Sequence, residues 1–385
     1  MGGGSVPLRV YVLRPPALRA YAATPSAIPV SEVFGRRVSR AWVWGDAFSD
    51  GIFWDCGMMF NVLLSCAGRR VELLRIWQRT LLELGARDMI LGEVLATDAQ
   101  PFAPAFILAD RCEIVPRATS PDFVPRMLEL CRQHEIRAVI PTIDTELLVL
   151  SEARDDFERI GTQVLVSDPE TIRLSADKRL THAWFVEHGF PTFRQCSPRD
   201  ALSDSDWPYP CIAKPASGSR SVGVERIASR EALELRIRNG QSDDVVESLG
   251  HGVEVTADAY VSLKTGKCLC VVPRRRLEVR DGEVSKGKTI EAPEIEALVR
   301  RVVEALPGAR GVLCVQMFWD PESREISLME INPRFGGGYP LTDASGARFT
   351  DWIVRELSGQ SVEECHAWTR NLVMLRYDKS VFIQG

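Results

Sequence analysis

The chain has 385 residues, a length that accommodates two or three packed domains with ordinary cores. Its hydrophobic fraction of 45% and charged fraction of 26% are typical of a soluble globular protein. A formal net charge of −5 gives no global reason to expect nucleic acid or an anionic membrane surface as a partner. No apolar run approaches the roughly 18 residues that a membrane span requires.

The ten cysteines are scattered, with no CxxC pair and no histidine at zinc-ligand spacing. Several of them lie in apolar, strand-like runs, namely Cys211, Cys268, Cys270 and Cys314. Buried free thiols in a reducing compartment are therefore favoured over disulfides, and we expect a cytoplasmic protein.

Residues 1–58 differ in texture from the rest of the chain. They hold a Gly2–Gly4 run, a Pro15-Pro16 pair and three tryptophans, without a sustained period of 2 or 3.6. No continuous apolar segment suggests a secretory signal. We expect an N-terminal extension that is poorly ordered, or a consequence of start-site choice, with folded protein beginning near Met59. The alternative is that its tryptophans dock on the folded part.

From residue 59 to 170 the pattern alternates strand and helix. A strand at 61–65 is followed by a helix whose apolar residues recur with the 3.6 period, and Gly85 is expected to end that helix. Strands separated by helices imply a parallel sheet with right-handed crossovers, and thus an open α/β domain. The remaining expected elements are strands at 89–97, 112–115, 137–141 and 163–166, and helices near 121–134 and 144–160.

Residues 171–365 have an α+β texture, with short-linked strands that are expected to pair antiparallel. Residues 366–385 form a C-terminal tail with one more strand near 372–377, and the sequence shows no internal repeat. The expected strands lie at 211–214, 222–227, 244–248, 253–262, 267–273, 311–319 and 325–331, and the helices at 177–188, 229–238 and 291–305.

The run Leu328–Gly338 carries the strongest chemical signal. An apolar strand presents Glu330 and, two residues later, Asn332, so both side chains point to the same face. Both offer the hard oxygen atoms that Mg²⁺ prefers. Arg334 follows, and then a glycine run through which backbone can approach a ligand. This combination indicates a place where magnesium and phosphate meet.

A second signal is the run Lys214–Val224, in which a strand delivers a lysine into a Gly/Ser loop. Such a loop can present backbone N–H groups and hydroxyls to phosphate oxygens. It is not a Walker A loop, because the lysine precedes the glycines. A third, weaker signal is Glu247–Val255, where two acidic residues flank a short linker. A solvated hairpin is the alternative reading of each.

Two basic clusters follow, Arg274–Arg276 and Lys286–Lys288, on either side of an Asp-Gly turn signal. They are expected to pair and to place positive charge near a reacting phosphate, or else to form a solvated basic hairpin. Asp144 and Glu146 follow a strand end, where open α/β sheets place ligands. They could touch substrate or cap the next helix.

In this order, the motif KPxxGSxSxGV, the ExxGxGxE spacing of Glu247 and Glu254, and the motif EINPRFGGG resemble the ATP-grasp superfamily, in particular the branch that is similar to the synthetase units of carbamoyl-phosphate synthase. The resemblance spans about residues 60–345. It implies a pre-grasp open parallel α/β sheet at 59–170, followed by an α+β ATP-grasp fold with a small lid subdomain at about 208–250.

The resemblance also implies roles for individual residues. Lys178 and Lys214 match the two ATP lysines, and Arg334 matches the arginine near the transferred phosphate. Lys286 and Arg275, from the basic clusters, are the other candidate catalytic residues. Gln316 stands where many relatives have a carboxylate ligand, so one metal would bind more weakly here. The remaining matches are Gly218, Ser219, Ser221 and Gly223 in the loop over the triphosphate, Glu247 and Leu249 at the adenine, Glu254 at the ribose, and Gln316, Glu330 and Asn332 as metal ligands.

The implied activity is an ATP-dependent carboxylate–amine ligase that works through an acyl phosphate, with Mg²⁺ (or Mn²⁺) as cofactor. Its expected partners are small-molecule carboxylate and amine substrates, without nucleic acid or membrane, and a homo-oligomer is compatible with the sequence. The alternatives are phosphorylation of bicarbonate or carbamate and a non-catalytic nucleotide-binding module. A Rossmann dehydrogenase is disfavoured because the first strand–helix turn lacks GxGxxG.

Overall fold

The structure is a computed structural model that describes residues 57–218, 222–280 and 282–383. Residues 57–377 form one compact unit. The expected order or disorder of the N-terminal extension lies outside the described residues, apart from strand β1 (Met58–Met59), which pairs in parallel with β3 (Ile90–Leu91). Within the described ranges, no helix has both the length and the apolar character that crossing a membrane requires.

The first part of the compact unit is an open parallel sheet, as expected. Its strands follow the order β5–β4–β2–β6–β7, and every neighbouring pair is parallel. Parallel neighbours need long crossover connections, which the helices supply. The elements are β2 (Asn61–Leu64), α1 (Val71–Asp88), β4 (Val94–Asp98), α2 (Pro104–Leu108), β5 (Arg111–Ile114), α3 (Phe123–Gln133), β6 (Ile136–Ile140), α4 (Asp144–Glu152), α5 (Arg154–Glu158), β7 (Gln163–Val164) and α6 (Pro169–Ala176).

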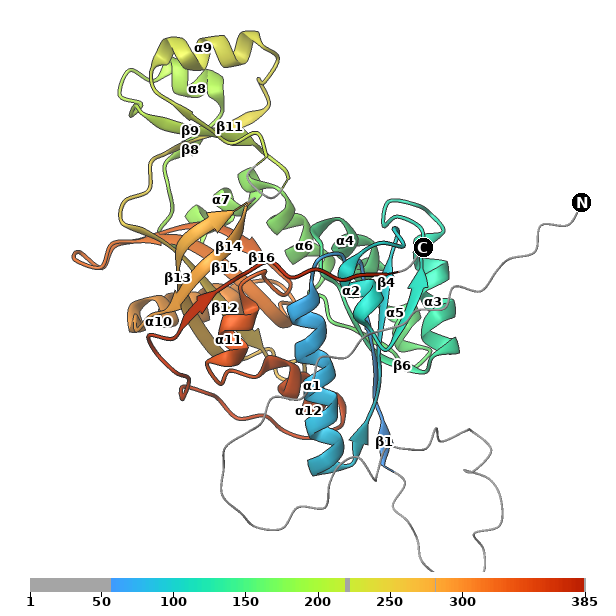
Figure 1. The fold of residues 1–385 in the computed structure, drawn as a ribbon. Helices are drawn as coiled ribbons and strands as arrows, with labels where there is room; N and C mark the ends of the chain where they lie inside the picture. Colours follow the sequence, from blue (N-terminus) through green and yellow to red (C-terminus); the bar gives the residue numbers. More distant parts are fainter. Residues whose placement is uncertain (1–56, 219–221, 281, 384–385) are drawn as a thin grey trace, which may run out of the picture. The chain divides into compact units, whose positions relative to one another are not determined.

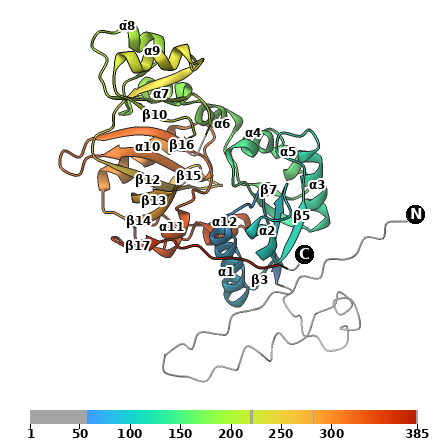
Figure 2. The same cartoon turned by 45° about the horizontal axis from the view of Figure 1, so that its top comes forward.

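Both faces of this sheet are covered by helices (Figure 2). Val62 and Leu64 of β2 belong to the same apolar cluster as Trp77 of α1. Leu63, between them, points the other way and clusters with Met127 of α3. Successive strand residues alternate faces, so a strand buried on both sides reads as a continuous apolar run. That run is what identified β2 in the sequence.

Helix α1 does not end at Gly85, so that prediction is wrong. The helix continues to Asp88, and Met89 ends it in a left-handed conformation with φ of 56°. A Cβ at position 85 would lie 2.9 Å from Leu91 Cδ2. The glycine therefore serves close packing between α1 and β3 rather than helix termination. The expected helix at 144–160 is likewise two helices, α4 and α5, which meet at Ala153.

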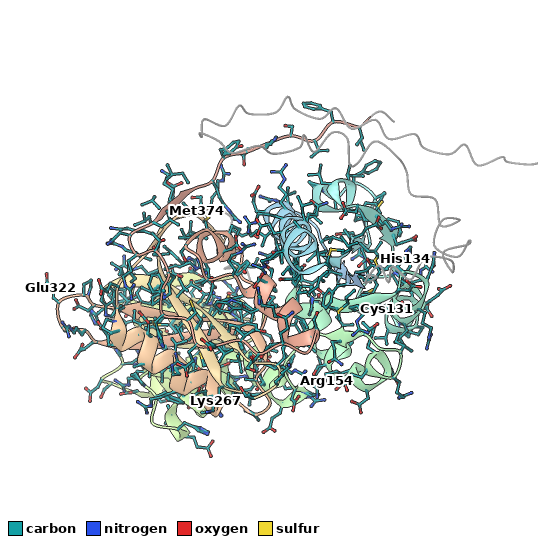
Figure 3. All side chains as sticks on the ribbon, turned by 90° about the horizontal axis from the view of Figure 1, so that it is seen from below. Cys131, His134, Arg154, Lys267, Glu322 and Met374 are labelled. Atoms are coloured by element: carbon teal, nitrogen blue, oxygen red, sulfur yellow. The ribbon has the colours of Figure 1, made fainter. Side chains whose placement is uncertain are left out.

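A second, six-stranded sheet has the order β16–β15–β12–β13–β14–β17, and all of its pairs are antiparallel. Strand β13 is longer than expected because it continues into a hairpin with β14, in which Arg280 stands opposite Glu283. At the far edge, β17, whose Met374 is labelled in Figure 3, pairs with β14. The elements are β12 (Val253–Val261), β13 (Cys268–Arg280), β14 (Glu283–Thr289), α10 (Pro293–Ala305), β15 (Gly311–Trp319), β16 (Ile326–Asn332), α11 (Tyr339–Ala344), α12 (Phe349–Leu357) and β17 (Val373–Leu375).

A small four-stranded sheet with the order β10–β9–β11–β8 is inserted between α7 and β12. Helices α8 and α9 lie on one side of it (Figure 1), where Leu233 and Val246 are buried in a core of their own. The elements are α7 (Lys178–Glu187), β8 (Gln195–Cys196), α8 (Pro198–Ser203), β9 (Cys211–Pro215), β10 (Glu225–Ile227), α9 (Arg230–Arg238) and β11 (Asp244–Ser248).

The two faces of the six-stranded sheet differ in character. On one face, Ala257, Val315 and other apolar residues form a continuous core with α10. On the other face, only one end is apolar, where Tyr260 and Val272 join a cluster with Phe349 of α12. The opposite end of that second face carries polar side chains. This division places a polar surface beside a packed core, and the candidate site lies there.

Candidate active site

Four neighbouring strands contribute the polar end of the sheet face. Side chains directly opposite each other in antiparallel strands share a face. The register pairs Thr256 of β12 with Gln316 of β15, and Gln316 with Glu330 of β16. Residues two positions away, such as Glu254 and Asn332, therefore point to the same side. The strand order thus brings together side chains that lie many residues apart in the sequence.

The three predicted metal ligands converge on one another. Glu330 Oε1 accepts a hydrogen bond from Gln316 Nε2 at 2.6 Å and another from Asn332 Nδ2 at 2.8 Å. Rotating the two amides would turn their carbonyl oxygens toward the same point as the carboxylate. One carboxylate and two carboxamides form an all-oxygen donor set that suits Mg²⁺. The described residues contain no cluster of three or more His, Cys, Asp or Glu that could hold a metal ion, so this set depends on its amides.

Arg276 of β13 belongs to this group, although the sequence analysis did not single it out. Its guanidinium pairs with the carboxylate of Glu254 and donates a hydrogen bond to Gln316 Oε1 at 3.1 Å. The carboxylate predicted to bind ribose is thus engaged by an arginine in this structure. The alternation of side chains along a strand could have identified Arg276 in the sequence. If Arg275 points to one face of β13, Arg276 must point to the other, which is the face of Glu254.

Arg275 is exposed and stands opposite Lys288 of β14, on the other face of the sheet. Lys286 is half-exposed, and its Nζ lies 2.6 Å from Glu278 Oε2. Strand β14 is also separated from β16 by β13, β12 and β15. The structure therefore does not bring Arg275 and Lys286 together with Glu330. The two basic segments pair as expected. The charges of Arg275 and Lys286, however, lie away from Glu330.

The small sheet contributes a buried ion pair. Lys214 of β9 and Glu247 of β11 are both buried, and Lys214 Nζ lies 2.6 Å from Glu247 Oε2. Gln195 Nε2 donates to the other carboxylate oxygen at 2.8 Å. The pair forms because β9 and β11 are neighbours, with Val245 opposite Lys214. Leu249, the other predicted adenine contact, is half-buried just beyond the end of β11.

Lys178, the first residue of α7, connects the two groups. Its backbone N–H donates to Ala216 O at 2.9 Å and its Nζ to Gly218 O at 3.1 Å. Burial lowers the pKa of Lys178 below the ordinary 10.5, while the nearby carboxylate of Glu330 opposes that shift and the ammonium of Lys214 adds to it. The amine is therefore within electrostatic reach of both the metal-ligand candidates and the buried ion pair.

The predicted phosphate loop is described at its two ends. Ser219 and Ser221 lie outside the described residues, and Gly218 is exposed. Gly223 has a φ of 76°, and a Cβ there would lie 2.9 Å from Pro215 Cγ, so the position requires glycine. The carbonyl of Gly223 accepts a hydrogen bond from Arg236 of α9 at 2.8 Å. Arg236, from a helix that packs on the small sheet, thus holds the residue at which the loop ends.

Arg334 joins the large sheet to the parallel sheet. Its guanidinium donates to both carboxylate oxygens of Asp144, at 2.6 and 2.9 Å, and to Asn332 Oδ1 at 3.1 Å. Glu146 is fully buried and accepts hydrogen bonds from the backbone N–H groups of Thr142 and Ile143. Glu146 therefore caps the start of α4, which is one of the two readings left open, whereas Asp144 binds Arg334, which neither reading included.

The glycines after Arg334 make room for protein groups. A Cβ at Gly338 would lie 2.0 Å from a terminal nitrogen of Arg274. Arg274 is itself buried and forms two hydrogen bonds with Asp258, at 2.8 and 2.7 Å. A buried, bidentate guanidinium requires this close approach of backbone. The run is therefore needed at Gly338 for packing against Arg274.

Comparison with known families matches the two parts of the chain separately. Residues 62–165 match the family model "PylC-like, N-terminal domain", and residues 175–338 match the model "ATP-grasp domain". The formate-dependent phosphoribosylglycinamide formyltransferase of Trichormus variabilis is 24% identical over 276 residues, which cover 66% of this chain and 67% of the relative. The D-alanine–D-alanine ligase of Kineococcus radiotolerans is 29% identical over 220 residues, covering 48% of this chain and 56% of the relative.

Solved structures share the fold at low sequence identity. Biotin carboxylase from Campylobacter jejuni has a TM-score of 0.64 at 14% identity, covering 81% of this chain and 74% of that one. N5-carboxyaminoimidazole synthetase from Staphylococcus aureus has a TM-score of 0.61 at 15% identity, covering 80% and 79%.

The matched family model and the fold define a ligase of the ATP-grasp type. Residues 175–338 are an ATP-grasp domain by the family model that they match, so the expected resemblance to the ATP-grasp superfamily is confirmed for this part of the chain. The expectation of an ATP-grasp ligase is confirmed, and with it ATP and Mg²⁺ as the general cofactors. The expected α/β architecture, with a parallel sheet followed by an antiparallel one, is confirmed as well.

Proposed function

We propose that this protein joins a small-molecule carboxylate to an amine through an acyl-phosphate intermediate, at the expense of ATP. The observation that carries the proposal is the convergence of three groups. They are the buried Lys214–Glu247 pair, the oxygen set of Gln316, Glu330 and Asn332, and Lys178. The amine of Lys178 interacts electrostatically with charges of both other groups. Positive charge beside hard oxygen donors suits a nucleotide triphosphate with its metal.

The proposed reaction has two steps. A carboxylate oxygen attacks the γ-phosphorus of ATP, the bond to the β–γ bridging oxygen breaks, and ADP leaves. The amine nitrogen then attacks the acyl carbon, the carbon–oxygen bond to phosphate breaks, and the amine loses a proton as inorganic phosphate departs. Phosphoryl transfer requires mainly positioning and charge neutralisation, so a nucleophilic side chain is not needed.

Each group has a part in this scheme. Gln316, Glu330 and Asn332 would hold Mg²⁺, which when bound neutralises charge on the phosphate oxygens. Lys178 and Lys214 donate to phosphate oxygens as point charges. Arg334, held by Asp144, presents its guanidinium beside Asn332 and steadies the transferred phosphoryl group. Gly218 and Gly223, which flank the predicted phosphate loop, would lie beside the triphosphate.

The two relatives named above are a formyltransferase described as formate-dependent and a ligase named for D-alanine, and both names fit a small carboxylate substrate. We propose the same class here, with Mn²⁺ as an alternative to Mg²⁺. The cytoplasm as location, a homo-oligomeric state and the domain limits 59–170, 171–365 and 208–250 remain proposals of the sequence analysis.

A hydroxamate assay tests the function. The purified full chain is incubated with Mg·ATP, hydroxylamine and pooled small carboxylates, and ADP and hydroxamate are measured. We expect carboxylate-dependent ADP release with a matching amount of hydroxamate, because hydroxylamine traps the acyl phosphate. ADP release with bicarbonate alone would favour phosphorylation of bicarbonate instead. ATP binding without any stimulated ADP release would indicate a non-catalytic nucleotide-binding module.

A further inference from the structure

Three arginines gather around Gly337, close to the phosphoryl-transfer site. Arg376, which follows β17, donates a hydrogen bond to Gly337 O at 2.5 Å. A Cβ at Gly337 would lie 3.2 Å from a terminal nitrogen of Arg70, at the start of α1. Arg334 lies three residues before Gly337 in the same segment. Arg70 and Arg376 come from opposite ends of the described chain, so folding alone brings them together.

Arg334 and Arg376 already have partners. Arg334 forms the bidentate pair with Asp144. Arg376 pairs with Glu283 of β14 at 3.2 Å, and this contact places Glu283 beside the same glycine. These two ion pairs fix the position of the arginines relative to the sheet.

Arg70 is different. Among the residues that the structure describes, its hydrogen-bond partner is the carbonyl of Thr142, at 3.4 Å, and it forms no ion pair. Its pKa is lowered by burial and then by the positive charge of Arg334, with Glu283 opposing the shift. A guanidinium offers five N–H donors, and most of them have no acceptor here. Arg70 is partly buried, and none of its nitrogen atoms is both buried and without a partner, so its unpaired N–H groups remain accessible to a ligand.

The surroundings favour an anion as that ligand. The guanidinium groups of Arg70, Arg334 and Arg376 outnumber the carboxylates of Asp144 and Glu283. Arg70 also stands at the N-terminus of α1, a helix of 18 residues without a side-chain cap, whose first N–H groups add partial positive charge. Within the two ion pairs one guanidinium charge is left over, which one carboxylate would neutralise; Glu330, which also acts on Arg334, is a candidate ligand of the metal.

We propose that Arg70, together with Arg376 and Arg334, binds a carboxylate group beside Gly337. This group belongs to the carboxylate substrate, which accepts the phosphoryl group and is called the acceptor here. This inference rests on the proposed function and deepens it, because it states where the acceptor lies. Arg334 also donates to Asn332, so a carboxylate held by this triad lies next to the metal-ligand candidates. The parallel sheet thus supplies, through Arg70, a substrate contact to a reaction centred on the other sheet.

The test is a thermal-shift titration of the full chain with Mg·ADP present and ionic strength held constant. The probes are formate, acetate, succinate and L-glutamate, with inorganic phosphate as a separate arm. The variants are Arg70→Met and Arg376→Met. The matched control is Arg75→Met, which removes the same charge from α1 at an exposed position whose partner is Glu72.

We expect at least one carboxylate to stabilise the wild type and the control, and both site variants to weaken its apparent affinity about 10-fold or more, since a charge-assisted hydrogen bond is lost. The inference is overturned if Arg70→Met titrates like the wild type, if no carboxylate stabilises the wild type, or if only phosphate does. Mg·ADP should stabilise all four proteins. If it fails to stabilise the wild type, the proposed function fails, and the carboxylate titrations still decide the arginine site.

Discussion

At the scale of single residues, Glu330 is the centre of the candidate metal site because two amides share one of its carboxylate oxygens. An amide can donate through its nitrogen or bind a cation through its oxygen, so Gln316 and Asn332 can serve either arrangement. Glu330 is the one member of this trio with a negative charge. The magnesium affinity of the site should therefore depend on it more than on either neighbour.

Replacing Glu330 with glutamine should lower turnover about 100-fold or more, because the carboxylate that would hold the metal becomes neutral. The change preserves shape, so the melting temperature should move by only a few degrees. Steady-state ADP release over a range of Mg²⁺ concentrations measures the effect. Glu325→Gln, at an exposed position just before β16, is the control and should behave like the wild type.

Lys214→Met should both weaken ATP binding and destabilise the protein. Removing the lysine leaves Glu247 buried without its ionic partner, which costs about 3 kcal/mol or more in typical proteins. Urea denaturation and nucleotide titration measure the two effects. The double variant Lys214→Met/Glu247→Leu should regain stability without regaining activity. Recovery of turnover in that double variant would contradict the assignment of Lys214 to the phosphates.

The lowered pKa of Lys178 predicts a pH dependence. The protonated amine binds phosphate, so kcat/KM for ATP should fall as pH rises through the pKa of Lys178 in the free enzyme. Because burial lowers that pKa, the fall should begin below the ordinary lysine value of 10.5. Lys178→Arg should move the fall to higher pH, since arginine keeps its proton. An unchanged pH profile in Lys178→Arg would assign the titration to another group.

At the scale of elements, strand alternation decides which charges meet. In β13, Arg274 is buried against Asp258, Arg276 reaches Glu254, and Arg275 between them faces the other way. The run of three arginines therefore splits into one packing residue, one site residue and one exposed residue. Helix α9 has a comparable role in the small sheet, where Arg236 binds Asp244 of β11 at 2.7 Å and the carbonyl of Gly223.

Arg236→Met should raise the KM for ATP several-fold with a smaller effect on kcat, because the loop that ends at Gly223 loses its anchor. It should also destabilise the small sheet, since the buried Asp244 loses its partner. ATP kinetics and limited proteolysis between β9 and β11 would measure these effects. The control is Arg238→Met, two residues later on the same helix, where the side chain is largely exposed. Equal effects of the two changes would contradict the anchoring role.

At the scale of the whole molecule, one apolar cluster contains residues from both main sheets. Val62 and Trp77 of the parallel-sheet region pack in the same cluster as Tyr260 and Phe349 of the antiparallel region. Polar contacts reinforce this contact, including the hydroxyls of Thr80 and Thr350 at 2.7 Å. The two regions match separate family models, and yet residues 57–377 form one compact unit.

A fragment of residues 171–385 should therefore fail to fold stably on its own. It would expose the apolar residues that the parallel-sheet region covers, such as Tyr260 and Phe349. Circular dichroism during urea denaturation, compared with the full chain, measures this. We expect the full chain to unfold in one cooperative transition and the fragment to show none. A cooperative transition in the fragment would mean that the shared cluster is dispensable.

Much of this fold can be predicted from the sequence because its signals are local. The apolar run of β2, the 3.6 period of α1 and the Lys214, Glu330 and Asn332 motifs depend on neighbours within a few residues. Alternation alone places Glu330 and Asn332 on one face. Strand existence, the change from parallel to antiparallel texture and the ATP-grasp resemblance follow from such patterns.

Tertiary structure alone decided which distant groups meet. The Lys214–Glu247 pair, the roles of Arg275 and Arg276, and the place of Arg70 depend on strand order, register and the packing of two sheets, none of which has a local signature. Gly85 shows the same limit, because its neighbour Leu91 lies beyond the helix that the glycine seemed to end. The sequence by itself determined the class of chemistry, through residue types at short spacings. The structure determined which cations face the site, because pleat and topology set the direction of each side chain.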